Sequence, residues 1–136
     1  MSLTSILICF INIAISFSLG ENLMPITENL EMTFEQRHIH LGQVKKGDKI
    51  DSTFIFINTG TENIEIEMIT SCECTTLDWT RKPILPGFKG QIHFVFDSTD
   101  KKESETIDID INLKNLDPET GYPILETISY SFEILI

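Results

Sequence analysis

The sequence predicts an all-β protein, an immunoglobulin-like β-sandwich of about seven strands that follows an N-terminal signal peptide. Apolar and polar residues alternate with a period of two in several short segments, which is typical of half-buried strands. Turn-forming residues separate these segments, and no window after residue 20 shows sustained helical periodicity. The chain has 136 residues, and the part after residue 20 suits the roughly 100 residues of an immunoglobulin-type sandwich.

The first twenty residues carry no charged side chain, and residues 6–17 are almost continuously apolar. Ser18 and Gly20 place small residues where a cleavage site requires them, so we predict a signal peptide over residues 1–20 that is cleaved after Gly20. An uncleaved membrane anchor and a buried N-terminal strand are the alternatives, but the apolar run is shorter than the about 20 residues of a membrane span. Cleavage predicts an extracytoplasmic protein, periplasmic or secreted.

Residues 21–28 are polar and contain Pro25, which predicts a short linker before a single domain over residues 29–136. Two segments near the start of that domain, around residues 30–34 and 39–44, are expected to add edge strands. Residues 53–58 are apolar on both faces near their middle, which predicts a central strand.

Four further segments place apolar residues on one face only, with polar residues such as Glu65 and Glu67 between them. Pro86 and Gly87 lie between two such segments and suit a type II turn, because proline presets φ and glycine accepts a positive φ. The residues predicted to point into the core are, in chain order, Ile64, Ile66 and Met68; Ile92, Phe94 and Phe96; Ile107, Ile109, Ile111 and Leu113; Ile128, Tyr130, Phe132 and Ile134.

The formal net charge is -11, and every charged residue lies after Gly20. A surface this negative repels phosphate backbones and anionic lipid headgroups, so nucleic acid is excluded as an expected partner. A membrane is expected only through the signal segment, if that segment is retained. The expected partner is therefore an envelope protein or a glycan whose identity the sequence does not give.

Several stretches resemble, in the same order and at similar spacing, a family of exported bacterial proteins, domain of unknown function 1573. That family is similar to the immunoglobulin-like domains of the abnormal-spindle and hydin type. The resemblance covers roughly residues 38–113 and implies a fold and an exported location but no established activity. The family usually has glycine where this chain has Glu73. The stretches that carry the resemblance are residues 41–47, 54–60, 71–76 and 83–87, followed by 90–92 and 96–97.

Cys72 and Cys74 form a Cys-x-Cys pair and are the one constellation that suggests site chemistry. An oxidising compartment favours a disulfide between them, and two buried thiols are the simpler alternative. Two thiolates on one side of a strand could instead bind a soft metal such as Cu(I) or Zn(II), with His38 and His40 as further ligands from a neighbouring strand. A small, reducible ring also makes a thiol-redox role conceivable. No cofactor is expected.

The other polar candidates have ordinary structural explanations. The Asp108 and Asp110 carboxylates share a face and could serve acid–base chemistry or bind calcium, but such pairs are usually the wet face of a sheet, as are Glu65 and Glu67. His93 is expected to be solvated on the polar side of its strand. Trp79 is expected to cap the core, with an exposed binding role as the alternative. No nucleophile elbow is evident, so we predict that the protein is not an enzyme.

These observations predict an exported, non-catalytic binding or scaffolding module of the cell envelope. The first alternative is a soft-metal-binding or thiol-redox protein that uses the Cys-x-Cys pair. The second is a periplasmic, chaperone-like domain that pairs a strand with a partner at an exposed sheet edge.

Overall fold

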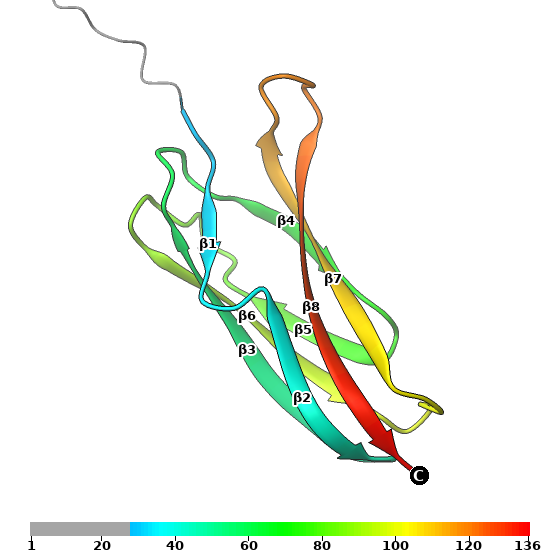
Figure 1. Ribbon diagram of the computed structural model, residues 1–136. Helices are drawn as coiled ribbons and strands as arrows, with labels where there is room; N and C mark the ends of the chain where they lie inside the picture. The colour runs from blue at the N-terminus through cyan, green and yellow to red at the C-terminus, as the bar shows by residue number, and fades with distance from the viewer. Residues whose placement is uncertain (1–27) are drawn as a thin grey trace, which may run out of the picture.

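The computed structural model describes residues 28–136 and consists of two stacked β-sheets (Figure 1). The predicted signal peptide, and all of the predicted linker except its last residue, lie outside the described residues. Within the described part of the chain, no helix is long and apolar enough to cross a membrane. The strands are β1 (Met32–Phe34), β2 (His38–Lys45), β3 (Lys49–Asn58), β4 (Ile66–Thr70), β5 (Thr75–Trp79), β6 (Lys89–Asp97), β7 (Glu105–Leu116) and β8 (Pro123–Leu135).

The first sheet has the strand order β1-β3-β6-β5, and the second has the order β2-β8-β7-β4. All neighbours are antiparallel except β2 and β8, which run parallel. The prediction of an all-β sandwich is confirmed. So are the central position of β3 and the edge positions of β1 and β2. The described residues form eight strands rather than about seven, because β5 was not predicted.

The core lies between the sheets and consists mainly of the side chains that the alternating pattern placed there. Phe94 from the first sheet stacks on Tyr130 from the second, with ring centroids 4.5 Å apart. Phe96 and Phe132 also meet across the sheets, with tilted rings whose centroids lie 4.4 Å apart. Burial of such aromatic and branched apolar side chains supplies most of the stability of a domain of this size.

The prediction that Met68 points into the core is wrong. The pairing of β4 with β7 shifts register between Ile66 and Met68, so the alternation changes face at that point. Met68 is 49% exposed, whereas Ile69 is 5% exposed and packs in the core. Ile64 remains buried, but it lies before β4 and forms an isolated bridge with Ile84.

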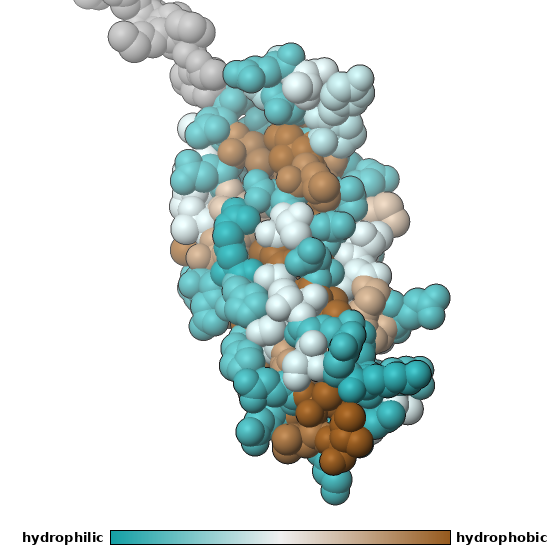
Figure 2. All heavy atoms as spheres, turned by 45° about the vertical axis from the view of Figure 1, so that its right-hand side comes forward, coloured by the Kyte–Doolittle hydropathy of each residue, from teal (hydrophilic) through white to brown (hydrophobic). Residues whose placement is uncertain are grey.

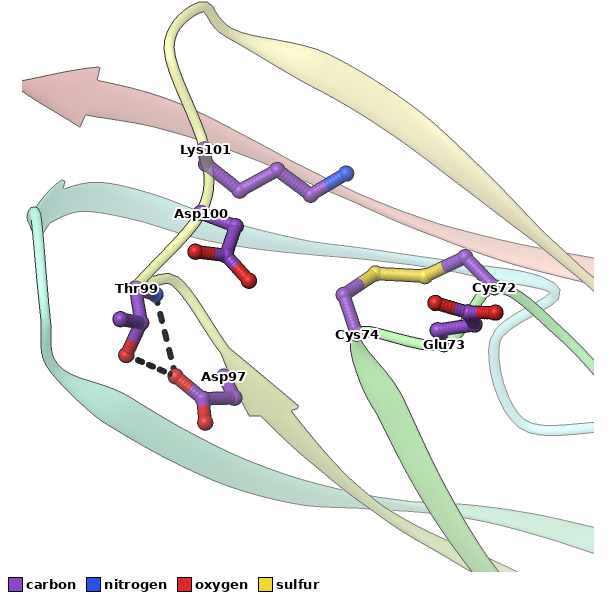
Figure 3. Close-up of a pocket in the computed structure, with 7 residues that line it drawn as sticks. All are labelled: Cys72, Glu73, Cys74, Asp97, Thr99, Asp100 and Lys101. Atoms are coloured by element: carbon purple, nitrogen blue, oxygen red, sulfur yellow. Dashed lines mark hydrogen bonds between the residues drawn. A yellow bond between two sulfur atoms is a disulfide. The ribbon is translucent and has the colours of Figure 1, made fainter.

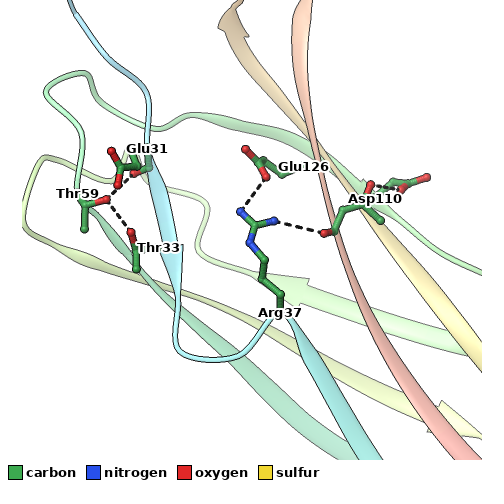
Figure 4. Close-up of polar contacts among 7 residues, drawn as sticks. Glu31, Thr33, Arg37, Thr59, Asp110 and Glu126 are labelled. Carbon is green, nitrogen blue, oxygen red and sulfur yellow. Dashed lines mark hydrogen bonds and ion pairs between the residues drawn. The ribbon is translucent and has the colours of Figure 1, made fainter.

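Arg37 lies between β1 and β2, where the chain passes from the first sheet to the second. Its guanidinium forms an ion pair with Glu126 at 3.0 Å and donates a longer hydrogen bond, at 3.5 Å, to the main-chain oxygen of Thr127 (Figure 4). The same group lies 5.0 Å from the centroid of the Phe34 ring. These contacts tie the sheet-to-sheet crossing to β8 on one side and to β1 on the other.

Candidate functional site

Cys72 and Cys74 lie in the turn between β4 and β5, and their sulfur atoms are joined in a disulfide with Cα atoms 5.2 Å apart. The main-chain N–H of Thr75 donates to the carbonyl of Cys72 at 3.1 Å, which closes the turn. Glu73 occupies the position where the family usually has glycine. No non-glycine residue of the described chain has a positive φ, so this turn accepts a side chain at Glu73 without strain.

The disulfide forms one wall of an open groove, and the loop that follows β6 forms the other (Figure 3). Three carboxylates, those of Glu73, Asp97 and Asp100, line this groove together with Lys101. Lys101 forms an ion pair with Glu105, and Lys49 forms one of 4.0 Å with Asp97, so the groove keeps an excess of negative charge from Glu73 and Asp100. The groove can therefore attract a cation or a positively charged group to the neighbourhood of the two sulfur atoms.

Hydrogen bonds fix the loop opposite the disulfide. The side-chain hydroxyl and the main-chain N–H of Thr99 both donate to Asp97 Oδ1, at 2.6 and 3.0 Å. These bonds lower the pKa of Asp97, chiefly through the Thr99 hydroxyl, and therefore favour its charged form. Ser98, which is fully buried, donates from its hydroxyl to the carbonyl of Asp48 at 2.7 Å and so joins the loop to the β2–β3 turn.

Two hydroxyl groups lie behind the disulfide, on the core side. Thr75 Oγ1 lies 3.2 Å from Cys72 Sγ and 3.6 Å from Cys74 Sγ. It also lies 2.6 Å from the hydroxyl oxygen of Tyr130. Burial raises the pKa of Tyr130, although its hydrogen bond with Thr75 works in the opposite direction. Nothing in the sequence pattern singles out Thr75, and the pattern predicts Tyr130 only as a core residue.

His38 and His40 do not join the cysteines. His38 shares hydrogen bonds of 2.8 Å with the hydroxyls of Ser129 and Ser131, and His40 shares one of 2.8 Å with Ser131. Tyr130 lies between those two serines on β8 and points to the opposite face, toward the disulfide. The histidines are thus on the outer face of the second sheet. Among the described residues no group of three or more histidine, cysteine or acidic side chains could hold a metal ion.

Most of the remaining polar candidates lie on strand faces, and Glu65 lies in the loop before β4. Asp108 is exposed, and Asp110 accepts a hydrogen bond from the Thr127 hydroxyl at 3.0 Å on the outer face of the second sheet. Glu65 and Glu67 are also exposed. His93 differs from the expectation of a simply solvated ring. Its Nδ1 lies 3.0 Å from the hydroxyl oxygen of Thr53, and its Nε2 lies 3.6 Å from Asp51.

Trp79 is half-buried and packs against the core, while the guanidinium of Arg81 covers its ring at 3.6 Å. This agrees with the expectation that Trp79 caps the sandwich. Strand β2, which is the longest edge strand, is interrupted by a register shift between His40 and Gln43. Because strand addition needs a regular edge, this geometry does not favour the chaperone-like alternative.

The loops at the opposite end of the molecule from the disulfide are joined to one another, and we call this region the hairpin end. It comprises residues 59–65 and 80–88 and the tip of the β7–β8 hairpin, residues 116–125. The N–H of Gly87 donates to the carbonyl of Asn58 at 2.7 Å, and the N–H of Lys114 donates to the carbonyl of Glu65 at 2.8 Å.

Two local structures hold the loops of the hairpin end in place. The buried Asn58 donates from its side-chain nitrogen to the carbonyls of Glu62 and Ile84, both at 2.8 Å. The turn over residues 85–88 has Gly87 at φ 82° and a hydrogen bond from Phe88 to Leu85, as a type II turn requires. The end is therefore a defined surface rather than a set of independent loops.

Exposed apolar side chains gather at the hairpin end. Figure 2 shows a brown, apolar area toward this upper end of the molecule. Five of the eight exposed large apolar residues of the described chain belong to the hairpin end. Next to them is a groove lined by the apolar side chains of Leu30, Leu116 and Ile124 and by several carboxylates. The five exposed residues are Leu85, Phe88, Leu116, Tyr122 and Leu125, with exposed fractions of 49%, 65%, 56%, 74% and 56%.

Two stacked sheets of this topology, with no helix among residues 28–136, define an immunoglobulin-like β-sandwich, a fold shared with a PapD-like domain of known structure. The chain belongs to the family described as "Protein of unknown function (DUF1573)", whose model matches residues 32–121. The predicted family is thus confirmed, over a longer stretch than the residues that suggested it. No curated protein matches the sequence.

Several solved structures share the fold. A protein of unknown function from Porphyromonas gingivalis W83 has a TM-score of 0.62 and 20% identity, over 78% of this chain and 47% of that one. The VesB protease of Vibrio cholerae has a TM-score of 0.60 and 13% identity, over 75% and 31%. The PapD-like domain 7 of human CEP192 has a TM-score of 0.59 and 10% identity, over 76% and 84%.

These identities show the fold alone. The chain spans about half the length of the Porphyromonas protein and about a third of the length of the protease. An activity that belongs to those longer proteins therefore does not pass to this domain by likeness.

Proposed function

We propose that this protein is an exported, non-catalytic binding domain that holds a partner protein at the hairpin end. The observation that carries the proposal is the concentration of exposed apolar side chains there, five of the eight on the described chain. Several large exposed apolar side chains gathered at one end of a domain are typical of an interaction site. Loops at one end of a sandwich are also where such domains commonly bind, since a rigid scaffold positions them.

Two features support export. The first twenty residues have the uncharged, apolar and small-residue pattern of a signal peptide. The disulfide between Cys72 and Cys74 suits an oxidising compartment, since cytoplasmic thiols are usually kept reduced.

The chemistry of the hairpin end selects the kind of partner. Carboxylates of Glu28, Asp117 and Glu119 stand beside the apolar side chains of the groove. A partner that fits this surface presents apolar side chains flanked by lysine or arginine, because the apolar contacts supply affinity and the opposite charges supply orientation. A protein satisfies both requirements better than a neutral glycan does.

A crosslinking experiment tests the binding surface. The full chain, with its own N-terminal segment, is produced in a bacterium with a photoreactive amino acid at position 122 or, as a control, at position 135. Leu135 is also exposed but lies at the other end of the sandwich. We expect a covalent adduct with a protein from position 122 alone, and its loss when Leu125→Ser is added.

The same samples test export. Mass spectrometry of the fractionated protein is expected to find Glu21 as the N-terminal residue, outside the cytoplasm. An intact N-terminal segment on a cytoplasmic protein would refute the exported role. Equal crosslinking from positions 122 and 135, or an adduct with glycan instead of protein, would refute the proposed binding surface.

A further inference from the structure

We propose that the Cys72–Cys74 disulfide is a reversible thiol–disulfide exchange site that accepts electrons from neutral or positively charged thiols. Thr75 acts in it as a positioning residue that stabilises the Cys72 thiolate when the bridge opens. This proposal concerns the end of the sandwich opposite the hairpin end and does not depend on the binding function proposed above.

The position of the bridge argues against a mainly structural role. The two cysteines are separated by two positions in sequence, so the bridge closes a very short loop. A disulfide stabilises a fold chiefly by restricting the unfolded chain, and this effect grows with loop length. The two cysteines are half-buried: they pack against the core on one side and line an open groove on the other, from which a thiol reagent can reach the bridge.

The hydroxyl groups behind the bridge suit a thiolate leaving group. If the buried Tyr130 hydroxyl donates to Thr75 Oγ1 at 2.6 Å, the hydrogen of the Thr75 hydroxyl is free to point at Cys72 Sγ, which is 3.2 Å away. A disulfide sulfur accepts such a bond weakly, whereas a thiolate accepts it strongly. The bond therefore strengthens as negative charge develops on Cys72, and a stabilised thiolate leaves faster.

The exchange proceeds in two balanced steps. A thiolate of an incoming dithiol attacks Cys74 Sγ, the bond between Cys74 and Cys72 breaks, and its electron pair stays on Cys72 as a thiolate that accepts the Thr75 hydrogen bond. The second thiolate of the reductant then attacks its own sulfur in the mixed disulfide and releases Cys74 as a thiolate. The reductant leaves as a disulfide, and both cysteine thiolates take protons from water.

The charges around the groove select the reductant. Glu73, Asp97 and Asp100 line it. Lys101 is paired with Glu105, and Lys49 lies 4.0 Å from Asp97, so the charges of Glu73 and Asp100 remain in excess. An anionic thiol meets repulsion from these carboxylates and from the net charge of -11, whereas a cationic thiol is attracted. The natural reductant is therefore a dithiol with neutral or basic surroundings.

Reduction of the purified full chain by two small thiols tests the selection. Cysteamine is cationic and 2-mercaptoethanesulfonate is anionic, and the rates are compared per thiolate by alkylation and intact mass. We expect cysteamine to react about tenfold faster at low salt, with a difference that shrinks as salt is added. Asp100→Asn is expected to narrow the ratio, while Glu119→Gln, at the hairpin end, leaves it unchanged.

A pair of threonine variants tests the positioning role. Thr75→Val removes the hydroxyl with little change in shape, and Thr76→Val is the matched control, because Thr76 is its exposed neighbour on β5. Thr75→Val is expected to slow reduction by about tenfold, as expected for the loss of a hydrogen bond to a charged group. It is also expected to shift alkylation of the reduced Cys72 to higher pH, which a merely structural role would not do.

Three results would overturn the proposal. The first is a bridge that resists both thiols until the protein is unfolded by denaturant. The second is equal reactivity of the cationic and anionic thiols at low salt. The third is a Thr75→Val variant that is folded by circular dichroism but does not differ from Thr76→Val. Its rate of reduction and the pH dependence of Cys72 alkylation would then equal those of the control. A Thr75→Val protein that does not fold is replaced by Thr75→Ser, which keeps the hydroxyl and must keep the wild-type rate.

Discussion

The hydroxyl oxygens of Thr75 and Tyr130 lie 2.6 Å apart and form a hydrogen bond between the two sheets of the sandwich. Thr75 belongs to β5 at the edge of the first sheet, and Tyr130 belongs to β8 in the interior of the second. Tyr130 is fully buried, so this bond and its contact with Cys74 take the place of water at its hydroxyl. The disulfide turn is thereby anchored to the core.

A double-mutant cycle measures this bond. Thr75→Val leaves the Tyr130 hydroxyl buried without its main partner and is expected to lower the free energy of unfolding by about 1–3 kcal/mol. Tyr130→Phe removes both the hydroxyl and its need for a partner. The double variant is therefore expected to be less destabilised than the sum of the single ones, with a coupling of about 1 kcal/mol in urea denaturation. Additive effects would show that the bond contributes nothing.

Ionisation of Tyr130 gives a second prediction. Burial, the largest cause, and the charge of Glu105 raise the pKa of Tyr130 above the ordinary value of about 10. The unfolded chain therefore loses this proton first. The contribution to stability is complete below the ordinary tyrosine pKa and is lost as pH rises toward and through the raised pKa of the folded protein.

The sequence contains two tyrosines, so Tyr122→Phe leaves Tyr130 as the one chromophore that reports tyrosinate. Ultraviolet titration of this variant is expected to show ionisation at a pH above that of a model tyrosine peptide. Thr75→Val is expected to move the titration further upward, because the Thr75 bond lowers the pKa. A midpoint equal to that of the peptide would contradict the burial of this hydroxyl.

The strand faces of β6, β7 and β8 could be predicted because these strands keep regular alternation through the core, as Ile92, Ile109 and Ile128 show. The face of Met68 could not be predicted. The register shift moves the side chains that follow it to the other face of the sheet, and local composition does not reveal such a shift. Strand β5 was missed for a different reason. It has five residues, and its inward positions begin with Thr75, a polar residue.

The Cys-x-Cys pair could be found from sequence, since both members lie together in the chain. Its surroundings could not. Tyr130 is 55 residues from Thr75. Asp97 ends β6 and Asp100 lies in the loop that follows it, yet both line the groove. Spacing along the chain carries no signal for such contacts, which the sheet topology creates.

The register shift in β4 can be tested by two alanine variants. Ile69→Ala empties a buried position and is expected to cost about 2–5 kcal/mol of unfolding free energy. Met68→Ala changes a side chain that is about half exposed and is expected to cost less than about 1 kcal/mol. Thermal and chemical denaturation report both values. A larger loss of unfolding free energy for Met68→Ala than for Ile69→Ala would instead mean that the alternation continues through β4 without a shift, with Met68 in the core.

Removal of the disulfide tests whether the bridge stabilises only its own turn or the whole sandwich. For a loop of three residues, chain entropy predicts a stabilisation of about 1.6 kcal/mol, well below the about 3 kcal/mol of a 15-residue loop. Cys72→Ser combined with Cys74→Ser is therefore expected to keep the sheet content of the wild type, by circular dichroism, with a modestly lower Tm. The aromatic contacts of the core do not pass through this bridge, since Phe94 and Phe96 pack directly on Tyr130.

Hydrogen exchange shows in which part of the fold the stability lost with the disulfide is located. Amides of the turn and of Thr75 are expected to exchange faster in the serine variant, while those of β7 keep the protection of the global fold, because local opening costs less than global unfolding. Uniformly faster exchange, or a chain that no longer folds, would mean that the bridge holds the whole sandwich together. The exchange site proposed above would then be untenable, because a bridge that the fold requires cannot open and close in the native protein.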